Sequence, residues 1–296
     1  MSDESNSTTP QWFWDAIDRK AETGFVEVAD CDINYLYWSQ SGNPGLLFVH
    51  GHNAHAHWWD FVAPSYADTF QTVALDLSGM GDSDHRDEYS ADLYAREIVA
   101  VADKCDMTKD TILVSHSFGG MVSIRTVAEY PDRFKGLILL DSGVKHPDDI
   151  RPPEPERLAA AKLYPSAEIA RSRFRLQPSQ QCANQFIVDH IARHSIEYID
   201  EGFGWKFDEE HRTRMLPYED VQNDFESIAI KAALIFGDSS EYFSQKSAEF
   251  MKSLLPQLEV TELADAQHHL FLEIHIGRYL IIFLLNQILF LLILEL

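Results

Sequence analysis

Cysteine is scarce in this chain of 296 residues, which contains three in all. Cys31, Cys105 and Cys182 lie far apart, and no Cys-x-x-Cys pair occurs. This usage excludes a disulfide framework and predicts reduced thiols in a cytoplasmic protein. The first residues also lack the basic and then apolar run of a secretory signal, which agrees with that expected location.

Positive charge is also in short supply. Lys and Arg number 24 against 47 Asp and Glu, so the formal net charge is −23, and no basic stripe interrupts the acidic excess. A surface of this kind excludes nucleic acid as a partner, because phosphate binding needs clustered cations. It would also repel polyanionic substrates, so we expect a neutral or apolar small-molecule substrate.

A long apolar run occurs at residues 279–296, where Asn286, Gln287 and Glu295 are the polar interruptions. The run falls slightly short of the roughly 20 residues that span a bilayer. We expect a last helix packed on the core, with its spare face open to a homodimer contact. A membrane role is the less favoured alternative.

Short apolar runs recur along the chain, and continuous runs are typical of strands buried on both faces of a parallel sheet. They lie at residues 46–50, 72–77, 111–116, 136–141, 232–237 and 258–263. Helical patterns lie between them at residues 58–67, 91–105, 118–130 and 244–255. This alternation predicts an α/β fold with a doubly wound, mostly parallel sheet. Residues 25–30 and 33–39 alternate in polarity and predict an antiparallel hairpin at its edge.

One interval breaks this rhythm. Residues 142–231 begin with a proline-rich stretch, contain no convincing strand run, and continue with helix-like segments such as residues 181–199. A helical cap inserted between two strands explains the interval better than a structureless loop. The expected organisation is an N-terminal tail (residues 1–20), one core (21–141 and 232–296) and a helical cap (142–231).

A serine stands where a strand runs into a helix, in Ser115-His116-Ser117-Phe118-Gly119. A tight turn there needs small residues two positions before and two after the serine, and Ser115 and Gly119 meet that need. We therefore take Ser117 as a nucleophile. Its hydroxyl needs a base within hydrogen-bond reach, and the loop after the last strand offers His268 and His269. His268 is the expected base because it comes first after the strand, and His269 is assigned to the pocket lining.

Four stretches together resemble the α/β-hydrolase superfamily, in its branch of esterases, epoxide hydrolases and dehalogenase-like enzymes. They are the His-Gly pair at residues 50–51, DLSGMGDSD at 76–84, SHSFGG at 115–120 and DAQHH at 265–269. The resemblance implies an eight-stranded, mostly parallel sheet with an inserted helical cap. Epoxide hydrolases and haloalkane dehalogenases carry Asp at the nucleophile position, so Ser117 points instead to acyl-enzyme chemistry.

The sequence leaves two candidates for the acidic residue of the implied triad. Many relatives place Asp where this chain has Ser240, and a hydroxyl cannot stabilise an imidazolium by charge. Asp141, at the end of the preceding strand, is the preferred acid, and Glu241 is the alternative. Ser240 would then act as a hydrogen-bonding helper.

The oxyanion hole is expected from two backbone amides, those of Phe118 and of His52, which follows Gly51. Gly51, His269, Trp58 and Trp205 are candidate pocket residues, although large aromatic residues more often pack in a core.

A rival pattern is metal binding. His50, His52, His55 and His57 resemble the His-x-His-x-Asp-His motif of metallo-β-lactamase-like hydrolases, but Ala54 replaces its Asp. We therefore expect no cofactor, with a metal-dependent hydrolase as an alternative.

The sequence thus predicts a carboxylesterase-like serine hydrolase that cleaves a small to medium, neutral and hydrophobic ester or lactone. A carbon-carbon bond hydrolase or a perhydrolase with the same triad is an alternative. A catalytically idle binding module is another.

Overall fold

The computed structural model describes residues 9–39, 44–149, 163–199, 201–272 and 286–287. Eight strands form one sheet, in the order β1-β2-β4-β3-β5-β6-β9-β10, and β7 pairs with β8 in a separate ribbon. The strands are β1 (Glu22–Glu27), β2 (Asp32–Tyr37), β3 (Gly45–Val49), β4 (Gln71–Leu75), β5 (Ile112–His116), β6 (Gly136–Leu140), β7 (Ile196–Ile199), β8 (Gly202–Trp205), β9 (Lys231–Gly237) and β10 (Glu259–Leu263).

The main sheet is mostly parallel. Strand β2 pairs antiparallel with both β1 and β4, and every other neighbouring pair is parallel. The predicted edge hairpin is β1–β2, and each of the six apolar runs forms a strand within one or two residues of its expected position. The predicted α/β fold class is therefore confirmed.

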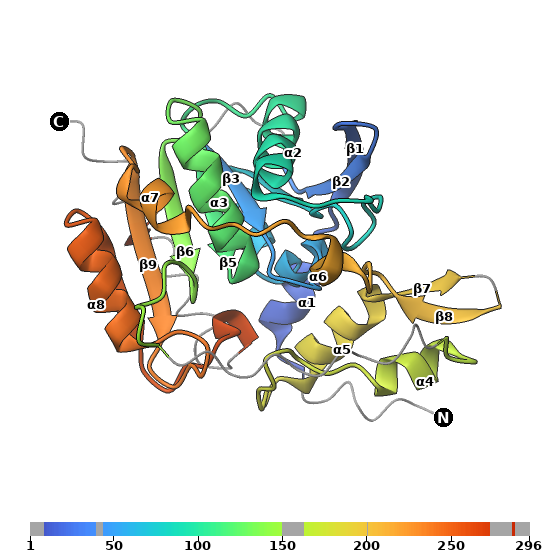
Figure 1. Ribbon diagram of the computed structural model, residues 1–296. Helices are drawn as coiled ribbons and strands as arrows, with labels where there is room; N and C mark the ends of the chain where they lie inside the picture. Colours follow the sequence, from blue (N-terminus) through green and yellow to red (C-terminus); the bar gives the residue numbers. More distant parts are fainter. Residues whose placement is uncertain (1–8, 40–43, 150–162, 200, 273–285, 288–296) are drawn as a thin grey trace.

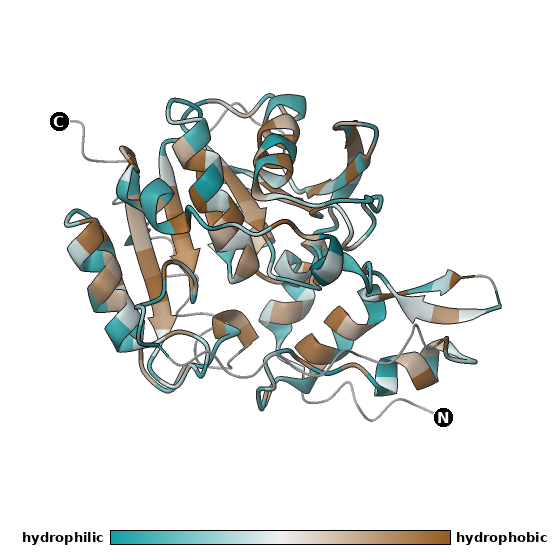
Figure 2. Ribbon diagram, viewed as in Figure 1, coloured by the Kyte–Doolittle hydropathy of each residue, from teal (hydrophilic) through white to brown (hydrophobic). Residues whose placement is uncertain are grey.

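The central strands are buried because helices and turns cover both faces of the sheet. Along β3, Leu46 and Phe48 point into one apolar cluster while Leu47 and Val49 point into the other. Alternate residues of a strand face opposite sides, so a strand covered on both sides must be apolar throughout. Figure 2 shows the central strands coloured as hydrophobic and the helices striped with hydrophilic residues.

Helices α2 and α3 lie side by side over one face of the sheet (Figure 1). The N-cap of α2 is Ser90, whose hydroxyl accepts from the Leu93 N–H at 3.2 Å. The α-helices are α1 (Gln11–Ile17), α2 (Ala91–Lys104), α3 (Phe118–Glu129), α4 (Ala167–Ser172), α5 (Gln185–His194), α6 (His211–Arg214), α7 (Val221–Glu226) and α8 (Gln245–Leu254). The 3₁₀ helices are η2 (Ala56–Trp59), η3 (Ala63–Ser65) and η4 (Leu270–Leu272).

The prediction of one helix at residues 58–67 is wrong. Two short 3₁₀ helices, η2 and η3, occupy this stretch. Pro64 lies in η3 and has no N–H to donate to the preceding turn, so an α-helix cannot run through it. The aromatic residues of the stretch are nonetheless buried in the core, among them Trp59 and Phe61.

The interval between β6 and β9 contains more than helices. We call residues 163–199 and 201–216 the insertion; it holds α4, α5, β7, β8 and α6 and lies at one end of the molecule (Figure 1). The expectation that this interval has no strand is wrong. Helix α5 ends at His194, and the Ser195 hydroxyl donates to the Ile191 carbonyl at 2.8 Å. Residues 196–199 then pair with β8, and three of these four residues are β-branched or aromatic.

Helix α7 packs against α3 of the core. The boundaries expected for the tail, core and cap stay predictions.

The apolar run at residues 279–296 falls outside the described residues except for 286–287, where the Gln287 amide donates to the Thr261 hydroxyl of β10 at 3.3 Å. In the part of the chain that the structure describes, no helix has the length and apolar character needed to span a bilayer.

A buried ion pair joins the edge hairpin, the loop after β4 and helix α2. The Arg86 guanidinium donates to Glu97 Oε1 and to the Ser78 hydroxyl, both at 3.1 Å. Its other N–H groups reach the carbonyls of Val28 and Ala29 at 2.6 and 2.9 Å. The Ser78 N–H donates to the second Glu97 oxygen at 3.0 Å, so every part of this network has a partner.

Replacing Arg86 by Met should lower the free energy of unfolding by about 3 kcal/mol, because Glu97 would keep a buried charge without its cation. Urea denaturation followed by circular dichroism measures this loss. The double variant Arg86→Met/Glu97→Met is the matched control and should recover much of it. Equal losses in the single and double variants would contradict the role given to the pair.

Candidate active site

Ser117 occupies the turn between β5 and α3. Its backbone has φ 52° and ψ −120°, a left-handed region that residues other than glycine seldom adopt. The turn brings Gly119 against the end of β3, where a Cβ would lie 2.3 Å from the His50 carbonyl oxygen. Ser115, where glycine is commoner, fits because its hydroxyl lies 2.7 Å from that of Ser123. The turn therefore requires small residues where the sequence places them.

His268 reaches Ser117 from the loop that follows β10. Its Nε2 lies 2.9 Å from Ser117 Oγ, and the ring is almost fully buried. Burial and, to a smaller extent, the nearby Lys145 ammonium lower the pKa of His268 from 6.5 to about 3. The imidazole is therefore neutral at pH 7, which leaves one ring nitrogen able to accept a proton.

Asp141 follows β6 and lies on the other side of the His268 ring. Its Oδ2 is 2.6 Å from His268 Nδ1, and it also accepts from the Ser240 hydroxyl at 2.7 Å. Its Oδ1 accepts from the Gly237 N–H at 3.1 Å. The bonds from Ser240 and Gly237 favour the ionised form, but burial outweighs them and raises the pKa of Asp141 to about 7. An Nδ1–H directed at Asp141 leaves Nε2 of His268 as the acceptor toward Ser117.

Among the candidates for the acidic residue, the structure brings Asp141 to His268, with Ser240 beside it. Glu241 is exposed on the loop after β9, and the hydrogen-bond partners of the His268 ring among the described residues are Asp141 and Ser117. Its neighbour Tyr242 packs its ring 4.8 Å from the imidazole of His268 instead. The geometry thus favours the expected acid over the alternative.

The two amides expected to form an oxyanion hole lie on either side of Ser117. A Cβ built on Gly51 would lie 3.2 Å from Ser117 Cβ, which places the turn before His52 next to the serine. Phe118 is the first residue of α3, a position whose N–H has no partner within its helix. Within the described residues, neither the Phe118 amide nor the His52 amide donates to a backbone carbonyl.

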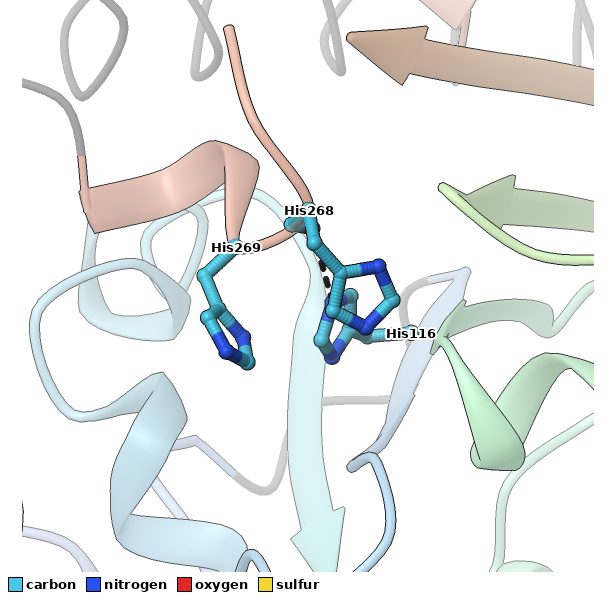
Figure 3. Close-up of side chains that lie close together, drawn as sticks. All are labelled: His116, His268 and His269. Atoms are coloured by element: carbon cyan, nitrogen blue, oxygen red, sulfur yellow. Dashed lines mark hydrogen bonds between the residues drawn. The ribbon is translucent and has the colours of Figure 1, made fainter. Parts of the chain in front are cut away.

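The imidazoles of His116, His268 and His269 lie close together (Figure 3). His116 Nε2 bonds to the His268 carbonyl at 3.1 Å, and the ring of His269 lies 4.9 Å from that of His268. Both nitrogens of His269 are buried without a hydrogen-bond partner among the described residues. Trp58 is buried, and its ring lies 5.3 Å from that of His269. Two of the candidate pocket residues, Trp58 and His269, therefore lie beside His268.

Trp205 lies elsewhere. It is in β8 of the insertion, where its ring packs against Tyr164 and Phe174, 5.8 and 6.2 Å away. No aromatic contact in the described chain joins Trp205 to Trp58 or His269. The structure therefore places it in the packing of the insertion and apart from the other pocket candidates.

Some residues of the site were missed by sequence reasoning. His116 precedes the nucleophile candidate in the motif and could have been suspected from that place. Gln180 accepts from the His269 N–H at 2.8 Å, and His211 Nδ1 lies 3.0 Å from His52 Nε2. Gln180 and His211 belong to the insertion, and no sequence motif there predicts a role for them.

The metal reading of the clustered histidines is not supported by their arrangement, because each ring has a different partner. His50 Nε2 accepts from the Leu77 N–H at 3.0 Å, while His52 faces the insertion. His55 Nε2 lies 2.8 Å from the Ser195 hydroxyl, and His57 Nδ1 lies 2.9 Å from an Asp60 oxygen. The four rings do not converge on one point, as the ligands of one ion must. These four histidines therefore do not form the metal site that the alternative of a metal-dependent hydrolase requires.

Comparisons with known proteins identify relatives of this chain. A cis-3-alkyl-4-alkyloxetan-2-one decarboxylase of Shewanella oneidensis is 29% identical over 124 residues, which cover 40% of this chain and 38% of that protein. A pimeloyl-[acyl-carrier protein] methyl ester esterase of Wigglesworthia glossinidia brevipalpis is 32% identical over 102 residues, 34% of this chain and 38% of that protein. The matches thus span well under half of these curated relatives.

Among solved structures, a thioesterase domain from the curacin biosynthetic pathway superposes with a TM-score of 0.72 and 24% identity, covering 91% of this chain and 99% of that one. That likeness concerns the fold. The model of the alpha/beta hydrolase family matches residues 46–275, most of the chain. The expected resemblance is confirmed, and the chain belongs to the alpha/beta hydrolase family.

Proposed function

We propose that the protein is a serine hydrolase that cleaves a small to medium, neutral and hydrophobic carboxylic ester or lactone through an acyl-enzyme. The observation that carries the proposal is the pair of contacts made by one imidazole, His268. Its Nε2 is 2.9 Å from Ser117 Oγ, and its Nδ1 is 2.6 Å from Asp141 Oδ2. A hydroxyl, a base and a carboxylate in this order are what acyl transfer requires.

In the proposed reaction, Ser117 Oγ attacks the carbonyl carbon while its proton passes to His268 Nε2. Asp141 stabilises the imidazolium so formed. Collapse of the tetrahedral intermediate breaks the bond to the alkoxy oxygen, which takes the proton from His268. Water then gives a proton to His268 as it attacks the acyl group. The acid leaves as this proton returns to Ser117 Oγ.

Two backbone amides, of Phe118 and His52, would bind the oxygen that becomes negative in the tetrahedral intermediate. Donors already aimed at that oxygen need no rearrangement during the reaction, and each can contribute on the order of 3 kcal/mol. The His211 ring supports this role by contacting the His52 side chain at 3.0 Å and so holding the residue that carries one amide.

The substrate class rests on charge and on the relatives. A net charge of −23 disfavours anionic substrates, and buried aromatic residues such as Trp58 line the neighbourhood of the site. The two relatives compared are named for a methyl ester and for an oxetan-2-one, a cyclic ester. The partner proposed is thus a small molecule, acted on without nucleic acid or cofactor. The three cysteines, which form no disulfide, support a reducing, cytoplasmic setting.

Ser117→Ala should lower kcat/KM for a p-nitrophenyl ester by at least about 10³-fold, since the oxygen that forms the acyl-enzyme is gone. A fluorophosphonate probe should label the wild type at Ser117 and leave the variant unlabelled, as read by mass spectrometry. Circular dichroism spectra of the two proteins control for folding. An unlabelled wild type would instead favour the idle binding module.

Asp141→Asn should lower kcat by about 10³ to 10⁴-fold, because an amide neither stabilises the imidazolium nor keeps the correct tautomer. Glu241→Gln is the matched control on the rival carboxylate and should retain turnover within about twofold, as expected of an exposed group. Steady-state kinetics on one ester compares them. Near wild-type turnover in the Asp141 variant would refute the assignment of the acid.

The pH profile tests the base. Protonated His268 cannot accept the Ser117 proton, and protonated Asp141 cannot stabilise the imidazolium, so the active form has both groups unprotonated. Burial raises the pKa of Asp141 to about 7 and lowers that of His268, so the pair takes up its first proton as the pH falls through about 7. We therefore expect kcat/KM to be level above about pH 8 and to decline about tenfold per pH unit below about pH 7. Rates measured between about pH 5 and 9 on protein shown to be folded check this. A profile that stays level down to about pH 5 would contradict it.

A further inference from the structure

The turn after β3 meets helix α5 of the insertion through a group of histidines outside the active site. Asp60 Oδ2 accepts from His57 Nδ1 at 2.9 Å and from His190 Nε2 at 2.8 Å. The rings of His57 and His194 stack with their centroids 3.9 Å apart. Two segments more than a hundred residues apart in sequence thus bring three imidazoles and one carboxylate together.

Three of these residues present ligand atoms close enough to share an ion. One ring nitrogen each of His57 and His194 and an oxygen of Asp60 all lie within 4.8 Å of one another. His190 and His194 are four residues apart on α5, with ring centroids 4.7 Å apart, so one helix face carries both. Among the described residues, neither ring nitrogen of His194 makes a hydrogen bond.

The charged groups around this cluster are one carboxylate, Asp60, and the Lys206 ammonium, which is paired with Asp82. An ion would replace the proton that lies between His57 Nδ1 and the Asp60 oxygen 2.9 Å away.

We propose that His57, Asp60 and His194 bind a divalent transition-metal ion at the junction between the core and the insertion. Two imidazoles and a carboxylate are ligands that Zn²⁺ accepts, and they leave one position of a tetrahedron to water. His190 holds Asp60 in place through its hydrogen bond, as outer partners of metal ligands do.

The ion would connect the insertion to the core, because His194 belongs to the insertion and the other two ligands to the core. Ser117 and His268 are not among its ligands, so the site stabilises the structure and takes no part in the chemistry. Its occupancy should appear as added thermal stability. Without an ion, the two segments are joined by the hydrogen bonds of Asp60 and by the contact of His55 with Ser195.

The test measures Zn²⁺ binding by isothermal titration calorimetry on the full chain freed of metal with a chelator. The variants His194→Gln and Asp60→Asn each remove one ligand. His85→Gln removes an exposed histidine elsewhere and is the matched control. His269→Gln reports on binding by the second group of close imidazoles, His116, His268 and His269, in the active site.

We expect about one Zn²⁺ per wild-type chain at this junction, with a dissociation constant weakened at least about tenfold in the His194 and Asp60 variants and unchanged in the His85 variant. Saturating Zn²⁺ should raise the melting temperature of the wild type by several degrees, and by clearly less in the His194 variant. Co²⁺ should give visible absorption bands that the same two variants lose.

Absence of binding at 100 µM Zn²⁺ would overturn the proposal. So would equal affinity in the wild type and in both ligand variants, or binding that only the His269 variant loses. Fluorophosphonate labelling of Ser117 in the His194 variant should proceed at the wild-type rate, which separates this proposal from the proposed hydrolase function.

Discussion

Parallel strands end at the same edge of a sheet, and the candidate active site depends on that constraint. Strands β5, β6, β9 and β10 are neighbours in this order, and each is followed at its carboxyl end by one residue of the site. These are Ser117, Asp141, Ser240 and His268. Residues up to 151 positions apart in sequence thereby come within hydrogen-bond distance.

Burial of this edge decides how the groups behave. It lowers the pKa of His268 and raises that of Asp141, while hydrogen bonds from Ser240 and Gly237 favour the ionised carboxylate. A neutral imidazole between a hydroxyl and a carboxylate can accept a proton and be stabilised once it has done so. The same burial strengthens each contact, because little water competes for the donors.

The insertion also contributes to the order of the site. Gln180 binds the backbone of His269 in the loop that carries His268, and His211 holds the ring of His52. The hydrogen bond between Asp60 and His190 is a further connection between the insertion and the core. Displacement of the insertion would therefore disturb both the loop that carries His268 and the turn that carries His52.

The strands and the turn at Ser117 could be predicted from the sequence, because continuous apolar runs and the small residues beside the serine are local requirements of burial and of a tight turn. The ribbon β7–β8 and the 3₁₀ helices could not, since there tertiary contacts and Pro64 override the helical pattern. The sequence preferred Asp141 as the acid but kept Glu241 as an alternative, and the contact of Asp141 with His268 is visible only in the tertiary structure. Pairing of β6 with β9 directs Asp141 and Ser240 toward His268, whereas Glu241 is left exposed.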